Sequence, residues 1–231
     1  MAAPAPGRPA VVLLSGGLDS ATSLAWAVER GFAAHALTVD YGQRHRGELD
    51  AAARLAASLG AASGRVVRVE LPGAVGSALT NPALSLPRER APEVIGRGIP
   101  ATYVPARNLL FLALALGLAE VVEAEDLFLG VNAVDYSGYP DCRPEFLRAF
   151  EAAARAGTRA GARGRPIVVQ APLLHMTKAE IVREAVRLGV PLAATISCYE
   201  TVERSPCGVC DACLLRARGF REAGLDDPAL A

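Results

Sequence analysis

The fold of this chain is decided by one stretch, Val11-Val12-Leu13-Leu14-Ser15-Gly16-Gly17-Leu18-Asp19-Ser20. Its apolar, β-branched first half predicts a strand, and the alanine-rich run after Ser20 predicts a helix. The two glycines between them let the backbone approach an anion closely and adopt positive φ. Backbone N–H groups, two serine hydroxyls and the helix start would then converge on one point and form a phosphate site. An ordinary tight turn with a serine cap is the alternative. The six residues Ser15–Ser20, placed directly between strand and helix, argue against it.

Composition limits the class of protein. The chain has 231 residues, of which 52% are hydrophobic and 21% charged, as expected of a globular protein with one α/β domain and a small appendage. Basic and acidic residues both number 24, so no overall field attracts nucleic acid. The N-terminus lacks a signal-peptide pattern, and no apolar run approaches the ~20 residues that span a bilayer. We therefore expect a cytoplasmic protein without a nucleic-acid or membrane partner, whose cysteines are reduced or bound to metal.

Apolar runs alternate with helical patterns, which predicts a doubly wound, mostly parallel five-stranded α/β sheet. The predicted strands are 10–14, 33–39, 65–71, 126–131 and 166–170, and the predicted helices are 20–30, 47–59, 108–123, 144–156 and 177–188. Residues 72–100 are rich in Pro, Gly and Arg and show no period. A connection of that length is typically a lid, an interface arm or a disordered loop.

Basic side chains follow the second predicted strand and precede the third predicted helix. Ligands of doubly wound sheets bind beyond the carboxyl ends of the strands, so Arg44, His45 and Arg46 are predicted to meet a phosphate or carboxylate. A solvated helix start is the alternative for them. Asn108 is the predicted N-cap of the most apolar helix. Arg107 before it can hold a carboxylate or phosphate bidentately, or lie on the surface.

The loop after the fourth predicted strand is dense in polar side chains. It holds Asp135, Ser137, Tyr139 and Asp141 within seven positions. Such density after a sheet strand predicts recognition of a small polar aromatic ligand. Cys142 at the end of the loop is interpreted as a passive thiol, because no adjacent His or Lys would activate it.

A capping box begins the last predicted helix, with Thr177 at the N-cap and Glu180 at the third helical position. Lys178 lies in the first turn, where the helix dipole disfavours a cation. An anion near this helix end, such as a nucleotide phosphate, would compensate. An exposed lysine is the alternative, at a cost of only a few tenths of a kcal/mol.

Four of the five cysteines lie within sixteen positions, at Cys198, Cys207, Cys210 and Cys213. Two successive C-x-x-C turns can present thiolates to one tetrahedral centre, which Cys198 completes. Four cysteines with no open position predict one structural zinc ion. An iron–sulfur cluster is the alternative, because C-x2-C-x2-C also begins the ferredoxin pattern, but no cysteine follows Cys213.

Together these segments resemble the 7-cyano-7-deazaguanine synthase family of the ATP pyrophosphatase superfamily. The segments that carry the resemblance are Ser15–Ser20, Asp40–Arg46, Tyr103–Leu109, Ser137–Cys142, Lys178–Ile181 and the four cysteines. One departure is Ala106, where the family often has glycine, and it bears on the backbone conformation there. The resemblance implies an adenine nucleotide alpha hydrolase-like fold, with an ATP pyrophosphatase-type domain over 10–190 and a zinc-binding element over 191–225.

The family likeness also implies a C–N-forming ligase that makes the nitrile 7-cyano-7-deazaguanine from 7-carboxy-7-deazaguanine and ammonia. One ATP adenylates the carboxylate, ammonia displaces AMP to give the amide, and a second ATP activates the amide oxygen so that loss of AMP leaves the nitrile. The implied cofactors are ATP, Mg²⁺ and one structural Zn²⁺ per chain. The implied partners are these small molecules, and we expect a homodimer.

Roles for individual residues follow from the same resemblance. Catalysis is expected of Asp19, Ser20, Lys178 and Arg107, with Asp19 facing Mg²⁺. ATP is expected to contact Leu14, Ser15, Gly16, Gly17, Leu18, Asp19, Ser20, Ala21 and Leu24. The substrate is expected to contact Arg44, His45, Asp135, Ser137, Tyr139 and Asp141, and zinc the four clustered cysteines.

Two other classes of function stay open at this point. A tRNA-modifying pyrophosphatase would share the loop, but the neutral net charge and the lack of a separate RNA-binding domain argue against it. A non-catalytic nucleotide-binding module would explain neither the four-cysteine group nor the polar loops.

Overall fold

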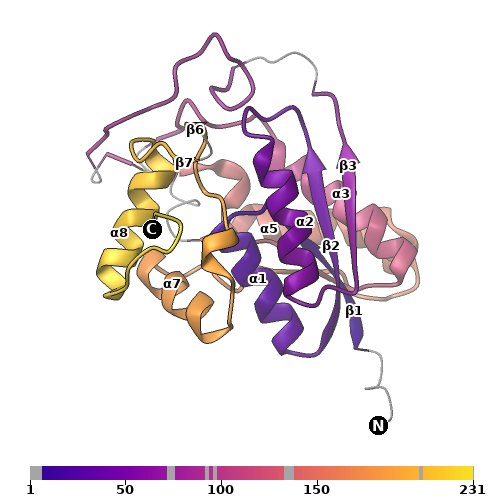
Figure 1. The fold of residues 1–231 in the computed structure, drawn as a ribbon. Helices are drawn as coiled ribbons and strands as arrows, with labels where there is room; N and C mark the ends of the chain where they lie inside the picture. The colour runs from indigo at the N-terminus through magenta and orange to yellow at the C-terminus, as the bar shows by residue number, and fades with distance from the viewer. Residues whose placement is uncertain are drawn as a thin grey trace.

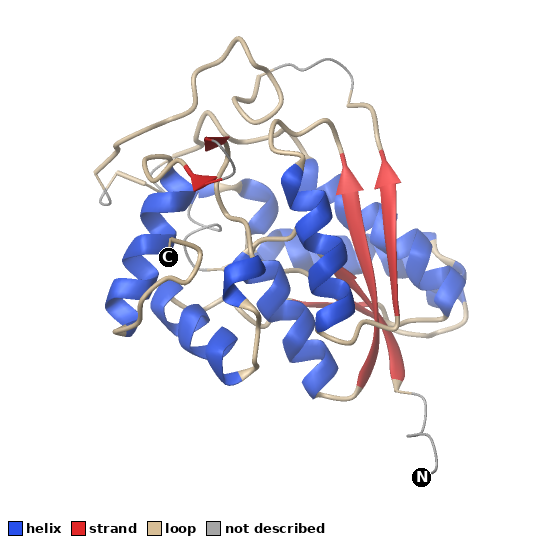
Figure 2. Cartoon of the chain, viewed as in Figure 1, coloured by secondary structure: helices blue, strands red, loops and turns tan. Residues whose placement is uncertain are grey.

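A computed structural model describes residues 7–71, 76–91, 94–95, 98–132, 138–202 and 205–230. Its central sheet has the strand order β3-β2-β1-β4-β5, and every neighbouring pair is parallel. Figure 1 labels β1, β2 and β3 of this sheet, and Figure 2 shows its strands in red. The strands are β1 Arg8–Leu13, β2 Phe32–Asp40, β3 Ser63–Arg68, β4 Asp126–Phe128 and β5 Val168–Gln170. The predicted five-stranded, doubly wound sheet is therefore confirmed. The fourth strand ends three residues earlier than predicted, and the chain beyond it turns towards a cavity.

Helices lie on both faces of this sheet (Figure 1). They are α1 Leu18–Glu29, α2 Gly47–Ser58, α3 Arg107–Val122, α5 Pro144–Gly157, α6 Arg159–Ala162, α7 Lys178–Arg187 and α8 Asp211–Ala223. Short 3-10 turns span Pro140–Cys142 and Leu192–Ala194, and a small hairpin pairs β6 Thr201–Val202 with β7 Ser205–Pro206. Helix α8 and this hairpin were not predicted. Among the described residues, no helix combines the length and the apolar character needed to cross a bilayer.

Two hydrophobic cores follow from the alternation of side chains along β1. Val12 and Leu14 face a core that contains α1, α2, α7 and Phe220 of α8. Val11 and Leu13 face the opposite core, which contains α3 and α5. In a strand, successive side chains point to opposite faces, so one apolar run fills both cores.

The order of the strands places a crevice beside β1. From β1 the chain passes through α1 to β2 on one side, while β4 pairs with β1 on the other side. The loops after β1 and β4 therefore diverge at their carboxyl ends, which is where doubly wound sheets bind ligands.

The start of α3 differs from the prediction. Ala106 is the N-cap residue, in the left-handed region with φ 55° and ψ 24°. Asn108 was expected to be the cap and lies inside the helix instead, where its backbone N–H donates to Asp141 Oδ2 over 2.9 Å. The Asp141 carboxylate thus satisfies a free donor of the first turn, which leaves the Asn108 amide free to bond the Asp141 carbonyl oxygen.

Part of the long Pro-rich connection packs across the C-terminal cysteine element. Arg88 forms an isolated antiparallel bridge with Cys210, and the Glu89 N–H donates to the carbonyl oxygen of Val209 over 2.8 Å. The Arg90 guanidinium holds both carboxylate oxygens of Asp211, at the start of α8. Residues 76–91 are therefore an ordered strap, and the disordered-loop interpretation is wrong for them.

Candidate active site and metal centre

A cavity of about 290 Å³ lies at the carboxyl ends of β1, β2 and β4. Among the residues predicted for ATP, catalysis or substrate, the lining includes Leu14, Ser15, Gly17, Leu18, Asp19, Ser20, Arg44, His45, Arg107, Tyr139 and Lys178. Because these side chains come from distant parts of the chain, the fold gathers most of the predicted site at one place.

The loop between β1 and α1 is held by its own serines. Ser20 Oγ accepts from the Ser15 N–H over 3.1 Å, lies 3.0 Å from Ser15 Oγ, and donates to the Gly17 carbonyl oxygen. Gly16 has φ +87°, and a Cβ there would collide with the carbonyl oxygen of Glu48. Glycine is therefore required at this position by both its conformation and its neighbour. The result is a tight turn with its N–H groups at the start of α1, as an anion site needs.

Asp19 is the centre of a polar cluster. Its Oδ2 accepts from Lys178 Nζ over 2.6 Å and from Asn132 Nδ2 over 2.8 Å. Its Oδ1 is buried and has no hydrogen-bond partner among the described residues. A buried carboxylate oxygen without a partner is costly, so this atom fits the ligand of a cation. Lys178, whose position in its helix predicted a nearby anion, finds one in Asp19.

Arg107 lines the cavity beside Tyr41 and Phe111, with its guanidinium carbon 5.9 Å from the Phe111 ring centroid. Burial alone would lower the pKa of Arg107. The electrostatic interaction and the hydrogen bond with Tyr41 outweigh burial, so the pKa of Arg107 is raised. The guanidinium therefore stays charged and can hold a carboxylate or phosphate.

Glu48, in the first turn of α2, also lines the cavity and was missed by the sequence analysis. Burial raises the pKa of its carboxyl to about 7, although the charge of Arg107 acts in the opposite direction. The only signal in the sequence was its place two residues after the basic run that ends at Arg46. An acidic residue in a first helical turn is common because it stabilises the helix, so its position alone does not indicate a cavity residue.

Two of the predicted substrate residues, Arg44 and His45, line the cavity and bond the backbone, and His45 Nε2 is buried without a partner among the described residues. The Arg44 guanidinium donates to the carbonyl oxygens of Ala78, Pro82 and Leu84 and so anchors the strap. His45 Nδ1 accepts from the Gly47 N–H over 3.0 Å, and burial lowers the pKa of the ring.

Several other predicted residues lie away from the cavity. Ala21 and Leu24 are buried in the core that contains α1, so their side chains do not line it. Gly16 packs beneath the loop, and Asp141 caps α3. Neighbours along the chain need not be neighbours in the cavity, because a helix turns every second or third side chain away, and contacts of these residues with ATP or substrate stay predictions. Asp135 and Ser137 lie outside the described residues.

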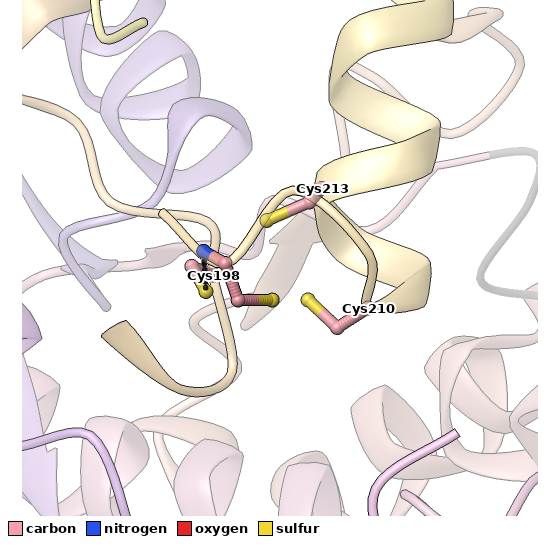
Figure 3. Close-up of side chains that lie close together, drawn as sticks. Cys198, Cys210 and Cys213 are labelled. Atoms are coloured by element: carbon pink, nitrogen blue, oxygen red, sulfur yellow. Dashed lines mark hydrogen bonds between the residues drawn. The ribbon is translucent and has the colours of Figure 1, made fainter. Parts of the chain in front are cut away.

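The four clustered cysteines lie between the loop after the last 3-10 turn and the start of α8, as Figure 3 shows for Cys198, Cys210 and Cys213. All four sulfur atoms are within 4.8 Å of one another. The hydrogen bond with Cys210 raises the pKa of the Cys198 thiol, and hydrogen bonds with Cys198 and Cys210 raise that of Cys213. The same contacts lower the pKa of Cys210. A thiolate at one cysteine thus disfavours ionisation of the neighbouring thiols. A central cation would relieve this repulsion, so the group fits a metal ion.

The cysteine element forms one wall of the cavity. The Ile196 N–H donates to the Gly16 carbonyl oxygen over 2.9 Å, and Ile196, Ser197 and Cys198 line the cavity. Buried Arg216 of α8 binds Asp227 and the Thr195 hydroxyl. A metal ion bound by the cysteines would therefore stabilise the segment at Ile196, which contacts the loop between β1 and α1.

Comparison with known proteins identifies the family. A family model described as "Queuosine biosynthesis protein QueC" matches residues 9–224. The chain belongs to the QueC family. A relative from Anaeromyxobacter sp. (strain Fw109-5), called 7-cyano-7-deazaguanine synthase, is 59% identical over 225 residues that cover 97% of each chain. A relative of the same name from Thiobacillus denitrificans (strain ATCC 25259 / T1) is 58% identical over 220 residues, covering 95% of this chain and 96% of the relative.

Solved structures of other proteins resemble this QueC family member more distantly. The NMN synthetase from Francisella tularensis is 15% identical, with a TM-score of 0.49, and the match covers 96% of this chain and 79% of that one. A 4-thiouridine synthetase in complex with RNA and ATP is 18% identical, with a TM-score of 0.48, over 93% of this chain and 53% of that one. Both are too distant to bear on the reaction.

Proposed function

We propose that this member of the QueC family converts 7-carboxy-7-deazaguanine and ammonia to 7-cyano-7-deazaguanine at the expense of ATP. One observation carries the proposal: Ser15, Lys178 and Arg107, from three separate elements, line the same cavity. They offer hydrogen-bond donors and positive charge to phosphates and to a substrate carboxylate. Relatives of 58–59% identity over nearly the whole chain bear the name of this enzyme.

The proposed chemistry proceeds in two rounds of adenylation. A carboxylate oxygen leaves poorly, so its attack on the α-phosphorus of ATP turns it into part of AMP, a good leaving group, and releases pyrophosphate. Ammonia then displaces AMP to give the amide. The amide oxygen is activated in the same way, and loss of AMP leaves the nitrile. Positioning and electrostatic stabilisation by the protein supply most of the catalysis in such a reaction.

Residues of the loop would hold ATP. The N–H groups and hydroxyls of Ser15, Gly17 and Ser20 would bind phosphate oxygens, and Lys178 would offset their charge. Mg²⁺ would be held through Asp19, whose buried Oδ1 has no hydrogen-bond partner in the described structure, and would offset charge on the departing pyrophosphate. Arg107 would hold the substrate carboxylate, with Tyr139 at the deazaguanine.

Zinc is the proposed metal of the four-cysteine group. Four thiolates without an open position suit structural zinc, and they also suit a reducing compartment, here the cytoplasm. A zinc element over 191–225 beside an ATP-binding domain over 10–190, and a homodimer, remain part of the same proposal.

The reaction can be tested with the purified protein, ATP and 7-carboxy-7-deazaguanine. Pyrophosphate should appear with the small-molecule substrate alone, and added tRNA should not change its rate. Pyrophosphate release that requires tRNA would favour a tRNA-modifying pyrophosphatase. Tight ATP binding without any pyrophosphate release would favour a non-catalytic nucleotide-binding module.

A further inference from the structure

Glu48 is the carboxylate of the cavity for which the proposed function has given no task. It is half-buried in the first turn of α2 and lines the cavity. Within the described part of the chain its carboxylate makes no hydrogen bond and no salt bridge, unlike that of Asp19. A carboxylate that faces a cavity without a protein partner is available to a ligand.

Glu48 lies between the loop that would hold the ATP phosphates and Arg107, which would hold the substrate carboxylate. On one side its own backbone carbonyl packs against Gly16 of the loop that would hold the ATP phosphates. On the other side it is close enough to Arg107 for the two charges to interact, and its own charge helps to raise the pKa of Tyr41. Arg107 is the proposed partner of the substrate carboxylate. The carbon that is adenylated would therefore lie within reach of the Glu48 side chain.

Ammonia needs a base at that point. In neutral water it is mostly ammonium, which has no lone pair with which to attack. We propose that Glu48 is the catalytic base that binds ammonium in the cavity and removes a proton from it, an inference that rests on the proposed function. A carboxylate attracts the cation, and the chain offers no other described cavity carboxylate without a protein partner.

The step balances as follows for the first round. A Glu48 oxygen takes one proton from ammonium and becomes a neutral carboxylic acid. The freed lone pair on nitrogen attacks the carbonyl carbon of the acyl adenylate and forms the C–N bond. The C–O bond to AMP then breaks, and its electron pair leaves with AMP. The surplus proton on nitrogen passes to the departing phosphate, and Glu48 later returns its own proton to water.

Electrostatics agree with this role. Burial, opposed by the charge of Arg107 on α3, raises the pKa of Glu48 to about 7, and a base works best when its pKa is near the working pH. Tyr41, which interacts with Glu48, has a pKa raised by burial, and His45, which lines the same cavity, has a pKa lowered by burial. Both side chains are therefore neutral near pH 7 and leave Glu48 as the group that titrates.

The test separates adenylation from amination. ATP–pyrophosphate exchange that depends on 7-carboxy-7-deazaguanine needs no ammonia and reports only the first half-reaction. Glu48→Gln should leave the exchange rate and its KM for the substrate close to wild type. With ammonium chloride present, amide formation at pH 7 should fall about 10²-fold or more. Asp50→Asn, which removes the same charge from an exposed position of the same helix, should change neither rate.

Dependence on pH gives the second readout. Raising the pH to about 9 supplies free ammonia, so the amination rate of Glu48→Gln should recover towards wild type. In wild type, kcat/KM for total ammonia should rise with pH and level off above about pH 7, once Glu48 has lost its proton. In Glu48→Gln it should instead keep rising towards about pH 9 with the fraction of free ammonia. A raised KM for the substrate in the exchange assay of Glu48→Gln would assign Glu48 to substrate binding and overturn the proposal, as would unchanged amination. Absence of exchange in wild type would instead remove the proposed function itself.

Discussion

Lys178 Nζ lies 2.6 Å from Asp19 Oδ2, so an ion pair joins the first turn of α7 to the first turn of α1 across 159 positions of sequence. Both side chains are largely buried, at 17% and 21% exposure. The pair brings the only lysine of the chain to the loop that would hold ATP. It also explains how a cation is tolerated at a helix N-terminus, because Asp19 supplies the compensating charge.

Removal of Lys178 should therefore damage adenylation more than stability. In Lys178→Ala, pyrophosphate release should fall about 10²- to 10³-fold, the usual effect of losing one stabilising donor at a reacting group. Steady-state kinetics measure it, and Arg183→Ala, on the exposed side of the same helix, is the matched control. A Lys178→Ala enzyme as active as that control would remove the lysine from the mechanism.

Ala106 should be a site where glycine stabilises the protein. Its left-handed φ of 55° costs a residue with a Cβ roughly 1–2 kcal/mol, and glycine avoids this cost at some loss of unfolded-state entropy. We expect Ala106→Gly to raise the free energy of unfolding by about 0.5–1 kcal/mol. Ala113→Gly, at an exposed position inside α3, should lower it by about 1 kcal/mol. Urea denaturation of both variants measures the difference in sign, and a loss of stability in both would contradict the assigned conformation.

The fold was predictable because its signals are local. The phosphate-type turn, the alternating strands and the capping box of Thr177 and Glu180 are short patterns, and the structure contains each of them. Helix α8 was missed because it starts one residue after Cys210, so the cysteine spacing hid the helical pattern that Gly224 ends. The strap could not be foreseen either. Its contacts, such as Arg90 with Asp211, join residues 121 positions apart.

Cavity residues were predictable only where they lie next to one another in the sequence. Ser15 and Asp19 follow from one turn, whereas Glu48 enters the cavity because α2 packs against Gly16, a contact between two elements. Asp141 shows another use of a carboxylate, because it accepts from the Asn108 N–H in the first turn of α3, and its contact with substrate stays a prediction. Residue type alone does not distinguish these two uses of a carboxylate.

Zinc content should depend on the clustered cysteines and not on Cys142. Wild-type protein should carry about one zinc per chain by elemental analysis, and Cys210→Ser should lose it together with several degrees of Tm, since metal binding and folding are coupled. Cys142→Ser should keep its zinc, because Cys142 lies outside the four-cysteine group. Bound iron with an absorbance band near ~400 nm would contradict the zinc assignment.

The buried pair of Arg216 and Asp227 should hold the C-terminal segment in place. Their side chains are 7% and 4% exposed, so Arg216→Ala leaves a buried carboxylate unpaired and should cost about 3–5 kcal/mol of unfolding free energy. Arg218→Ala removes a partner of an exposed pair with Glu222 and should cost less than about 1 kcal/mol. Chemical denaturation of the two variants should show this contrast, and equal losses would count against the role of Arg216.

The most direct test of the whole account is the number of AMP molecules released per nitrile. Carboxylate to nitrile removes two oxygen atoms, so 7-carboxy-7-deazaguanine with ATP and ammonia should yield two AMP and two pyrophosphate for each 7-cyano-7-deazaguanine. The free amide, supplied as substrate, should yield one of each. Nitrile that accumulates with ADP and phosphate would contradict adenylation, because transfer of the γ-phosphate needs the phosphates held differently from the loop at Ser15–Ser20.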